Sequence, residues 1–578
     1  MQIRAPCATL YTSLFSRGPP GNAAADPPLE KSCMSQPPTY DEQALERDTL
    51  AREVARRRTF AIISHPDAGK TTLTEKLLLY AGAIELAGAV RGRKSRRQAT
   101  SDWMEIEQQR GISISAAALE FEMDGHHVTM LDTPGHQDFS EDTYRTLLAV
   151  DSVVMVIDAA KGIEAQTLKL FEVCRTRRIP VLTFINKLDQ PSRDPFALTD
   201  EIERVLGISA APMNWPLGDG IDFRGVYDLE QRALLLYERQ GGGGRSAPVA
   251  VTHPGDPLVE ATVGSRRQHE LGEAIEIITG AGTKFDAAEY RAGRQTPVFF
   301  GSALHDFAVE PFLKALLSLA PSPGPRLTTD GVVDPTDPFL SGFVFKIQAN
   351  MNPRHRDRVA FFRICSGRLT KDMLVDHERH GTRMRLSRVY RFFGRDRETV
   401  PEAYAGDVVG LVNPGQLTIG DTLYAGRRVR FPPMPPFPCE RFGTIRPAEV
   451  RHKRFDEAVH QLAEEGLLQV FTPRNGSPHP IVGVVGALQF DVIQARMASE
   501  YGMPCEIEPL PHVAARWPVP AGPDTAPLNL PLSGVTRVTD AQQRTVLLLA
   551  SDFDLRFCIE RNPDVRFHAS PASEIAPS

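Results

Sequence analysis

The chain contains, at 59–71, the sequence Thr59-Phe60-Ala61-Ile62-Ile63-Ser64-His65-Pro66-Asp67-Ala68-Gly69-Lys70-Thr71. Its first half is an apolar run, which predicts a buried strand over 59–64. A loop of small residues follows and ends in Gly-Lys-Thr, directly before a helical pattern over 71–81. This order of strand, loop and helix predicts a phosphate-binding loop. Ser64 stands where the usual pattern has its first glycine, and a small residue there still permits the bend.

Each part of this loop suits one part of a nucleoside triphosphate. The backbone N–H groups of 67–71 would point at the β-phosphate, aided by the N-terminus of the following helix. The Lys70 ammonium would bridge the β- and γ-phosphates as a catalytic group, and the Thr71 hydroxyl would bind Mg²⁺. An ordinary Gly-containing turn is the alternative for the motif taken alone. The predicted nucleotide-binding residues here are Ser64, His65, Pro66, Asp67, Ala68, Gly69, Lys70 and Thr71.

A second motif closes the strand predicted over 127–131, and it consists of Asp132, Thr133, Pro134, Gly135 and His136. The alternation of the strand turns the Asp132 carboxylate toward the nucleotide, where it would hold Mg²⁺ through a bound water. The Gly135 N–H would sense the γ-phosphate. The His136 imidazole would orient the attacking water, because phosphoryl transfer needs positioning more than covalent chemistry. A solvated loop histidine is the alternative.

A third motif would recognise the base, and it consists of Asn186, Lys187, Leu188 and Asp189 at the end of the strand predicted over 181–186. The Asp189 carboxylate can accept from guanine N1–H and from the exocyclic amino group, a pair that adenine does not present. Two such bonds, at roughly 1.5–3 kcal/mol each, suffice to select GTP over ATP. Asn186 would bond the base and brace the loops, and the Lys187 stem would pack on the ring. A backbone N–H of Ser302-Ala303-Leu304 would reach guanine O6.

Between the first two motifs lies the segment Arg110-Gly111-Ile112-Ser113-Ile114. Its Ser113 hydroxyl could reach Mg²⁺ and the γ-phosphate, which would make the segment a switch that is ordered by GTP and released after hydrolysis. The predicted cofactors are therefore GTP or GDP with Mg²⁺, and the predicted metal ligands are Thr71, Ser113 and Asp132. The basic cluster Arg91–Arg97 upstream is interpreted as either a solvated mobile loop or an RNA contact.

Apolar runs and helical patterns alternate from Thr59 to about Leu319, which predicts a parallel sheet with helices on both faces. Ligands then bind at the carboxyl ends of the strands, where all three motifs fall. The long stretch before the last strand, near 297–301, predicts a folded insertion at about 205–292. We therefore predict a multidomain α/β protein whose P-loop GTPase domain spans 46–325 and carries an α+β insertion.

Two proline-rich linkers divide the remainder of the chain, near 321–338 and 432–438. Short strands and Gly-containing turns between them predict a β-barrel domain over 335–431. Helical spacing and one clear strand, 481–485, predict an α+β domain over 439–578. The Pro-rich stretch beyond Pro511 has no clear pattern.

Composition is that of an ordinary globular protein, with 42% hydrophobic and 24% charged residues among 578. No apolar run approaches the roughly 18 residues of a membrane span. The 7 cysteines have no paired spacing, which favours a reducing compartment. The net charge of −6 argues against indiscriminate coating of nucleic acid.

The N-terminal stretch contains no acidic residue over 1–25 and has the composition of a transit peptide. Proline pairs at 19–20 and 27–28 would break an amphipathic helix, which favours a disordered tail or a true start at Met34. We leave residues 1–45 out of the predicted fold. We expect a cytoplasmic protein, with organellar targeting by this tail as the alternative.

Arginines recur in the predicted barrel between Arg379 and Arg397, beside Tyr390 and two phenylalanines. Strand alternation with one face in water explains this pattern as well as contact with RNA phosphates does. His377 and His380 have no cysteine or third histidine nearby, so we interpret them as surface residues rather than metal ligands.

These motifs together make the chain resemble the translational GTPases, and within them the bacterial peptide chain release factor 3 family. The resemblance runs from about Arg56 to His568 and is clearest in 58–71, 138–146 and 342–351. Ser64 and Pro66 in the first loop separate that family from elongation factor G, and the serine at 113 also matches it. The resemblance implies a GTPase domain with an insertion, a β-barrel and a third domain.

The resemblance also implies a function and its partners. A member of this family would be a monomer that binds the ribosome, is activated by it, and stimulates release and recycling of the codon-reading release factors. No membrane would be involved. An elongation factor G-like translocase is one alternative, although that family has further domains after the third. A nucleotide-gated ribosome-binding module without hydrolysis is another, which His136 and the predicted Mg²⁺ ligands argue against.

Overall fold

The structure is a computed structural model, and it describes residues 40–83, 107, 113–237, 249–251, 253–280, 282–349, 358–393, 396–413, 415–434, 437–448, 453–474, 476–520 and 528–570. The predicted tail before 40, the Arg91–Arg97 cluster and the switch residues 110–112 lie outside them. Contacts divide the chain into a unit of residues 1–46 and a unit of 47–578. Helix α1 (Tyr40–Ala55) spans this boundary, so regular structure begins inside the stretch expected to be a tail.

The nucleotide-binding domain is built on a central sheet that confirms the predicted fold class. Its neighbouring strands are parallel, except that the first pair, β2 with β3, is antiparallel. Sequence analysis did not anticipate β2 or β6. In spatial order the strands are β2 (Ala117–Met123), β3 (His126–Asp132), β1 (Arg57–Ser64), β4 (Ser152–Asp158), β5 (Val181–Asn186), β11 (Gln295–Phe300) and β6 (Ser209–Pro212).

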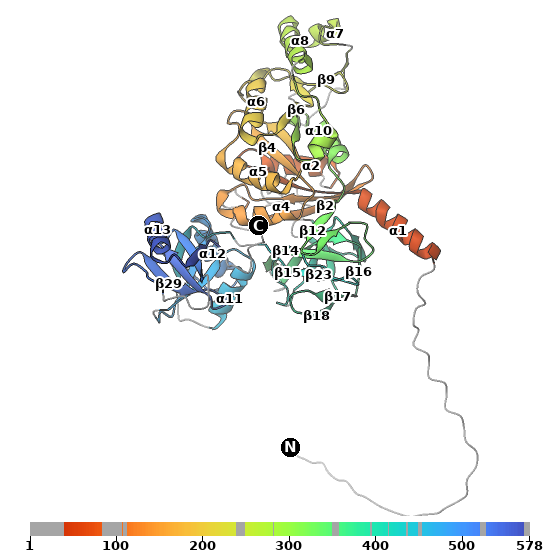
Figure 1. Ribbon diagram of the computed structural model, residues 1–578. Helices are drawn as coiled ribbons and strands as arrows, with labels where there is room; N and C mark the ends of the chain where they lie inside the picture. The colour runs from red at the N-terminus through yellow and green to blue at the C-terminus, as the bar shows by residue number, and fades with distance from the viewer. Residues whose placement is uncertain are drawn as a thin grey trace, which may run out of the picture. The chain divides into compact units, whose positions relative to one another are not determined.

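Helices cover both faces of this sheet (Figure 1). Neighbouring side chains along its central strands alternate between two apolar cores, one on each face. One core joins Ile63 and Met155 to helices α4 (Ser140–Leu148), α5 (Ala165–Arg177) and α6 (Pro195–Leu206). The other joins Ile62 and Val154 to helices α2 (Lys70–Tyr80) and α10 (Val309–Leu319). The sheet is thus buried on both sides, and its loops remain at its carboxyl edge.

The insertion forms a separate sheet of 4 strands, in the order β10-β9-β8-β7, with helices beside it. Residues 209–212, which were expected to belong to the insertion, instead form β6 and pair with β11 in the central sheet. The elements of the insertion are β7 (Asn214–Pro216), η2 (Gly220–Asp222), β8 (Gly225–Asp228), β9 (Ala233–Leu236), β10 (Val249–Ala250), α7 (Pro257–Val263), α8 (Ser265–Gly280) and α9 (Ala287–Arg291).

Antiparallel strands make up the domain that sequence analysis expected to be a barrel. Its core contains Val344, Phe362 and Leu423. Several of its arginines pair with carboxylates of the same chain, such as Arg379 with Asp421. A separate hairpin of β12 (Arg326–Thr328) and β13 (Gly331–Val333) occupies part of the stretch 321–338 that was predicted to be a linker. The strands of the domain itself are β14 (Ser341–Ala349), β15 (Arg358–Ser366), β16 (Arg368–Thr370), β17 (Met373–His377), β18 (Thr382–Leu386), β19 (Val389–Phe393), β20 (Asp396–Thr399), β21 (Glu402–Tyr404), β22 (Val408–Val412) and β23 (Thr422–Tyr424).

An antiparallel sheet of 8 strands, flanked by helices, forms the C-terminal part. The stretch beyond Pro511, which has no clear sequence pattern, supplies β28, β29, β30, α13 and β31. The elements are β24 (Arg441–Pro447), α11 (Lys453–Glu464), β25 (Gln469–Pro473), β26 (Ile481–Val484), α12 (Leu488–Ser499), β27 (Cys505–Leu510), β28 (Ala514–Pro520), β29 (Val535–Thr539), β30 (Thr545–Leu549), α13 (Asp552–Arg561) and β31 (Val565–His568).

Candidate nucleotide-binding site

The first loop of the site joins β1 to α2. Its turn needs left-handed backbone at Asp67, with φ of 64°, and at Gly69, with φ of 90°. A Cβ at Gly69 would overlap Asn186 Nδ2, so only glycine lets this loop approach the third motif. Helix α2 then begins at Lys70 with its first N–H groups directed at the loop. The loop therefore has the backbone geometry that phosphate binding requires.

Lys70 and Asp132 meet beneath this loop. Lys70 Nζ donates to Asp132 Oδ1 at 2.6 Å, and Asp132 is 2% exposed. Among the described residues, Asp132 Oδ2 is buried without a hydrogen-bond partner. A buried carboxylate oxygen of this kind is unfavourable unless a ligand or metal ion engages it. The pair thus joins the phosphate loop to the end of β3.

His65 is a second buried polar group in the loop. Its ring is fully buried, both ring nitrogens lack hydrogen-bond partners among the described residues, and Nε2 lies 3.9 Å from Glu164 Oε1. Burial lowers the pKa of His65 below its ordinary value, and the nearby Glu164 charge offsets only part of this effect. The neutral imidazole is therefore the favoured form at neutral pH.

The base-reading motif forms the loop after β5, and the segment after β11 holds it in place. Asn186 donates from Nδ2 to the Ala68 carbonyl and accepts the Ala303 N–H on Oδ1, each at 2.8 Å. Ser302 Oγ donates to Asp189 Oδ1 at 2.5 Å. Asn186 therefore ties three loops together. The Ala303 N–H is one of the three backbone groups that were expected to supply a bond to guanine O6, and in this structure it bonds Asn186.

Lys187 has a partner that sequence analysis did not identify. Its ammonium lies 2.9 Å from Asp158 Oδ2, at the end of β4. Burial alone would raise the pKa of Asp158, but the Lys187 ammonium and the Ala160 N–H outweigh it and lower the pKa. Asp158 is the last residue of a buried strand, as Asp132 is. That shared position is the sequence feature by which Asp158 could have been predicted to belong to the site. The ion pair fixes the lysine stem beside the base loop.

His305 is a second residue of the site that the sequence pattern does not predict. Its Nε2 lies 3.7 Å from Asp189 Oδ2, so the carboxylate has Ser302 on one side and an imidazole on the other. The histidine is in a loop after β11 with no motif of its own, so only the folded chain reveals its position.

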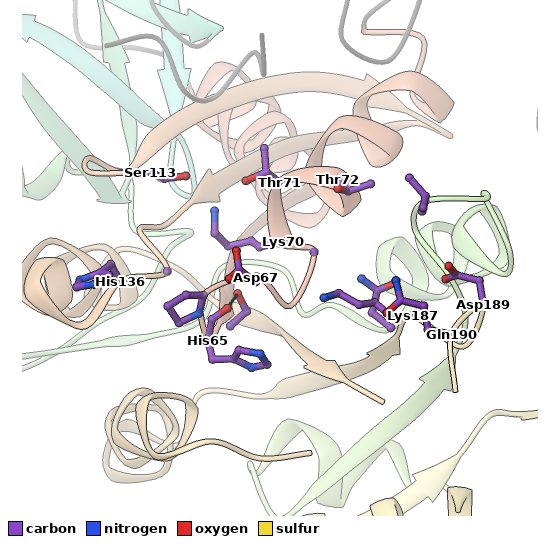
Figure 2. A pocket seen from close by; sticks show the side chains of 16 residues that line it. His65, Asp67, Lys70, Thr71, Thr72, Ser113, His136, Lys187, Asp189 and Gln190 are labelled. Carbon is purple, nitrogen blue, oxygen red and sulfur yellow. Dashed lines mark hydrogen bonds between the residues drawn. The ribbon is translucent and has the colours of Figure 1, made fainter. Parts of the chain in front are cut away.

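His136 lies at the margin of the site, where it is the N-cap residue of the short helix η1 (Gln137–Phe139). Its Nδ1 accepts the Asp138 N–H at 3.2 Å, and the side chain is 32% exposed. Nε2 is therefore the ring atom that could orient water. Figure 2 shows His136 and Ser113 to one side of Lys70, with Lys187, Asp189 and Gln190 to the other.

Residues next to Ser113 and His136 contact the following domains. Lys346 Nζ of β14 donates to the Ser115 hydroxyl at 2.5 Å. The Leu488 N–H at the start of α12 donates to Asp138 Oδ2 at 2.7 Å. Ile114, Phe139 and Val492 share a small apolar cluster. If nucleotide binding displaced the segment near Ser113 or the segment near His136, contacts with the following domains would therefore change.

The phosphate loop, the segments at Ser113 and at 135–136, and the base-reading loop enclose a cavity of about 430 Å³. Of the predicted residues, Ala68, Asp132, Thr133, Pro134, Leu188, Ser302 and Ala303 are buried around it rather than on its surface. Thr72, Gln190 and Leu304 are additional lining residues. The lining comprises Ser64, His65, Pro66, Asp67, Gly69, Lys70, Thr71, Thr72, Ser113, Gly135, His136, Asn186, Lys187, Asp189, Gln190 and Leu304.

A phosphate loop, a buried acidic residue after β3 and an Asn-Lys-Leu-Asp loop around one cavity define a guanine-nucleotide-binding P-loop domain. Family models agree with this class. One described as "Elongation factor Tu GTP binding domain" matches residues 55–322. Others described as "Elongation factor G domain 2" and "Class II release factor RF3, C-terminal domain" match 339–426 and 431–559.

Curated relatives identify the family. The chain is 52% identical to peptide chain release factor 3 of Symbiobacterium thermophilum, over 90% of this chain and 99% of that protein. It is 51% identical to peptide chain release factor 3 of Gloeobacter violaceus, over 92% of this chain and 100% of that protein. The chain belongs to the peptide chain release factor 3 family.

A solved structure supports the fold alone. A crystal structure of a Thermus thermophilus protein superposes with a TM-score of 0.63 at 24% identity, covering 84% of this chain and 72% of that one. Across the part of the chain that the structure describes, no helix is both long and apolar enough to cross a membrane.

Proposed function

We propose that this chain is a ribosome-dependent GTPase of translation termination. It would hydrolyse GTP to GDP and phosphate and would stimulate release and recycling of codon-reading release factors. The observation that carries the proposal is the convergence of 64–72, 113, 135–136 and 186–190 on one cavity. Family membership supports the role in termination.

Base selection would fall to Asp189. Its carboxylate is held by Ser302 Oγ at 2.5 Å and is 7% exposed. A buried, oriented carboxylate accepts the two guanine donors without an entropic cost of ordering, and it repels the acceptor pattern of adenine. The Lys187 stem, anchored by Asp158, would pack on the ring.

The residues around the phosphates fit a divalent cation. Asp132 Oδ2 is a buried acceptor without a hydrogen-bond partner among the described residues, and Thr71 and Ser113 line the cavity around which Asp132 is buried. Such hard oxygen donors are those that Mg²⁺ prefers. When bound, Mg²⁺ would neutralise charge on the β- and γ-phosphates. Lys70 would move from Asp132 toward the phosphates, which compete for its ammonium.

Water positioning would fall to His136. Because Nδ1 accepts the Asp138 N–H, Nε2 would face the attacking water. Lys70 and the loop N–H groups would stabilise charge that develops on the phosphates. Ribosome binding would complete this arrangement by bringing His136 closer to the γ-phosphate. The protein would act as a cytoplasmic monomer.

The test is GTP turnover by the full chain, alone and with ribosomes that carry a codon-reading release factor. We expect slow turnover alone and stimulation of at least about a hundredfold by the loaded ribosomes. Translocation of transfer RNA in the same assay would support an elongation factor G-like role instead. Tight GTP binding without hydrolysis would support a nucleotide-gated module. Either result would overturn the proposal.

A further inference from the structure

The loop between β7 and β8, residues 217–223, contacts the base-reading loop; we call it the brace. The Gly220 N–H donates to the carbonyls of Leu188 at 2.9 Å and Gln190 at 3.2 Å. Asp219 Oδ2 accepts the Ser192 N–H at 2.8 Å. The backbone that carries Asp189 is therefore bonded to the brace on both sides of that residue.

The same hairpin also packs against the second base-reading loop, 302–307. Phe223 of the brace is 1% exposed, and its ring centroid lies 5.4 Å from that of Phe307. Phe307 exchanges backbone hydrogen bonds with Ser302, at 2.9 and 3.0 Å. Ser302 in turn donates to Asp189. Thus the insertion reaches the Asp189 carboxylate through two independent routes.

Internal bonds make the brace a defined loop rather than a loose one. The Leu217 N–H donates to the Gly225 carbonyl at 2.9 Å, and the Arg224 N–H donates to the Leu217 carbonyl at 3.1 Å. Gly220 has φ of 54°, and a Cβ there would lie 3.4 Å from Pro191 N. A side chain at 220 would strain the turn, because this φ lies in the left-handed region, and it would stand in van der Waals contact with Pro191 at the end of the base loop.

We propose that the brace is a specificity-determining element: Asp219 and Gly220 are positioning residues that hold Asp189 in register with guanine. The inference rests on the proposed nucleotide binding and deepens it. An exposed loop that follows Asp189 would otherwise sample several positions, and the two hydrogen bonds to guanine would form less often. Loss of the brace contacts should therefore weaken base recognition while phosphate contacts persist.

The test variants are Asp219→Ala and Gly220→Ala. Their matched controls are Asp222→Ala, whose carboxylate pairs with Arg267, and Gly207→Ala, where φ is 69° and no atom lies within 4 Å of an added Cβ. Asp219→Asn retains an oxygen acceptor for the Ser192 N–H and should restore most of the wild-type behaviour. Each variant is made in the full chain.

The measurements are the dissociation rate of fluorescent GDP and the ratio of affinities for GDP and IDP. The base of IDP lacks the exocyclic amino group of guanine, so a displaced Asp189 lowers the affinity for GDP more than the affinity for IDP. We expect about three- to tenfold faster GDP release and a GDP/IDP ratio lowered about threefold in both test variants, which corresponds to the partial loss of one hydrogen bond. The controls should match wild type.

Unchanged release and an unchanged ratio in both test variants would overturn the inference. An equal loss of GDP and IDP affinity, accompanied by a lower Tm, would also overturn it, because it would show general destabilisation. A wild-type chain that binds GDP but is not stimulated by ribosomes would refute the proposed function while leaving the inference testable.

Discussion

Replacement of Asp189 by asparagine tests base recognition by changing a single oxygen of the carboxylate to an amide nitrogen. The carboxylate is 7% exposed, and Ser302 Oγ holds its Oδ1 at 2.5 Å. The asparagine amide would keep one acceptor but would present an N–H donor to the guanine donors. The loss of one or two charge-assisted bonds, at roughly 1.5–3 kcal/mol each, corresponds to about one to four orders of magnitude in GDP affinity. The affinity of the variant for xanthine nucleotides should rise, because xanthine offers an acceptor at position 2.

The assay is competition of GDP and XDP against a fluorescent nucleotide, with affinity measured for both. Ser302→Ala is the companion variant, because it removes the hydroxyl that orients Asp189 and leaves the carboxylate. It should weaken GDP binding about fivefold without producing a preference for xanthine. If Asp189→Asn retained its selectivity for guanine, the assignment of Asp189 to the base would be refuted.

The other predictions concern water positioning, pH and the N-terminus. His136→Ala should leave GTP affinity nearly unchanged and lower ribosome-stimulated turnover at least about a hundredfold; unchanged turnover in a stopped-flow phosphate assay would remove its role. Burial lowers the pKa of His65, so the unfolded chain takes up the proton first as pH falls. Stability should decline as pH drops below about 6.5, the ordinary value for histidine. His65→Gln should reduce the dependence of stability on pH, measured by thermal unfolding between about pH 5.5 and 7.5. The same dependence in the variant and the wild type would contradict a lowered pKa of His65. Deletion of residues 1–33 should leave GTPase activity unaltered in vitro; loss of folding, seen by circular dichroism, would show that the segment is structural.

Some buried strands of the nucleotide-binding domain could be predicted closely. Strand β5 matches its predicted range, 181–186, because it is a largely apolar run that is buried on both faces. Strand β2 was missed because Glu120 interrupts its apolar pattern. In the structure this glutamate is buried and pairs with Arg391 of β19, a partner that is remote in sequence. Pro518 and Pro520 similarly obscured β28.

The convergence of the three motifs on one cavity could be predicted from residue types and order, but the supporting contacts could not. Lys70 and Asp132 were assigned to phosphate and metal from their motifs, and they lie together in the folded chain. The contacts of Asp158, His305 and Gly220 depend on tertiary pairing between loops. No local pattern encodes such pairing, because the interacting residues belong to separate segments with ordinary turn composition.

The most direct test of the central claim is calorimetric titration of the full chain with GDP and, separately, ADP, each with Mg²⁺. A single cavity formed by the phosphate and base-reading loops predicts binding of one GDP per chain and affinity for ADP at least about a hundredfold weaker. Heat of similar size and affinity for both nucleotides, or no heat with GDP, would contradict it.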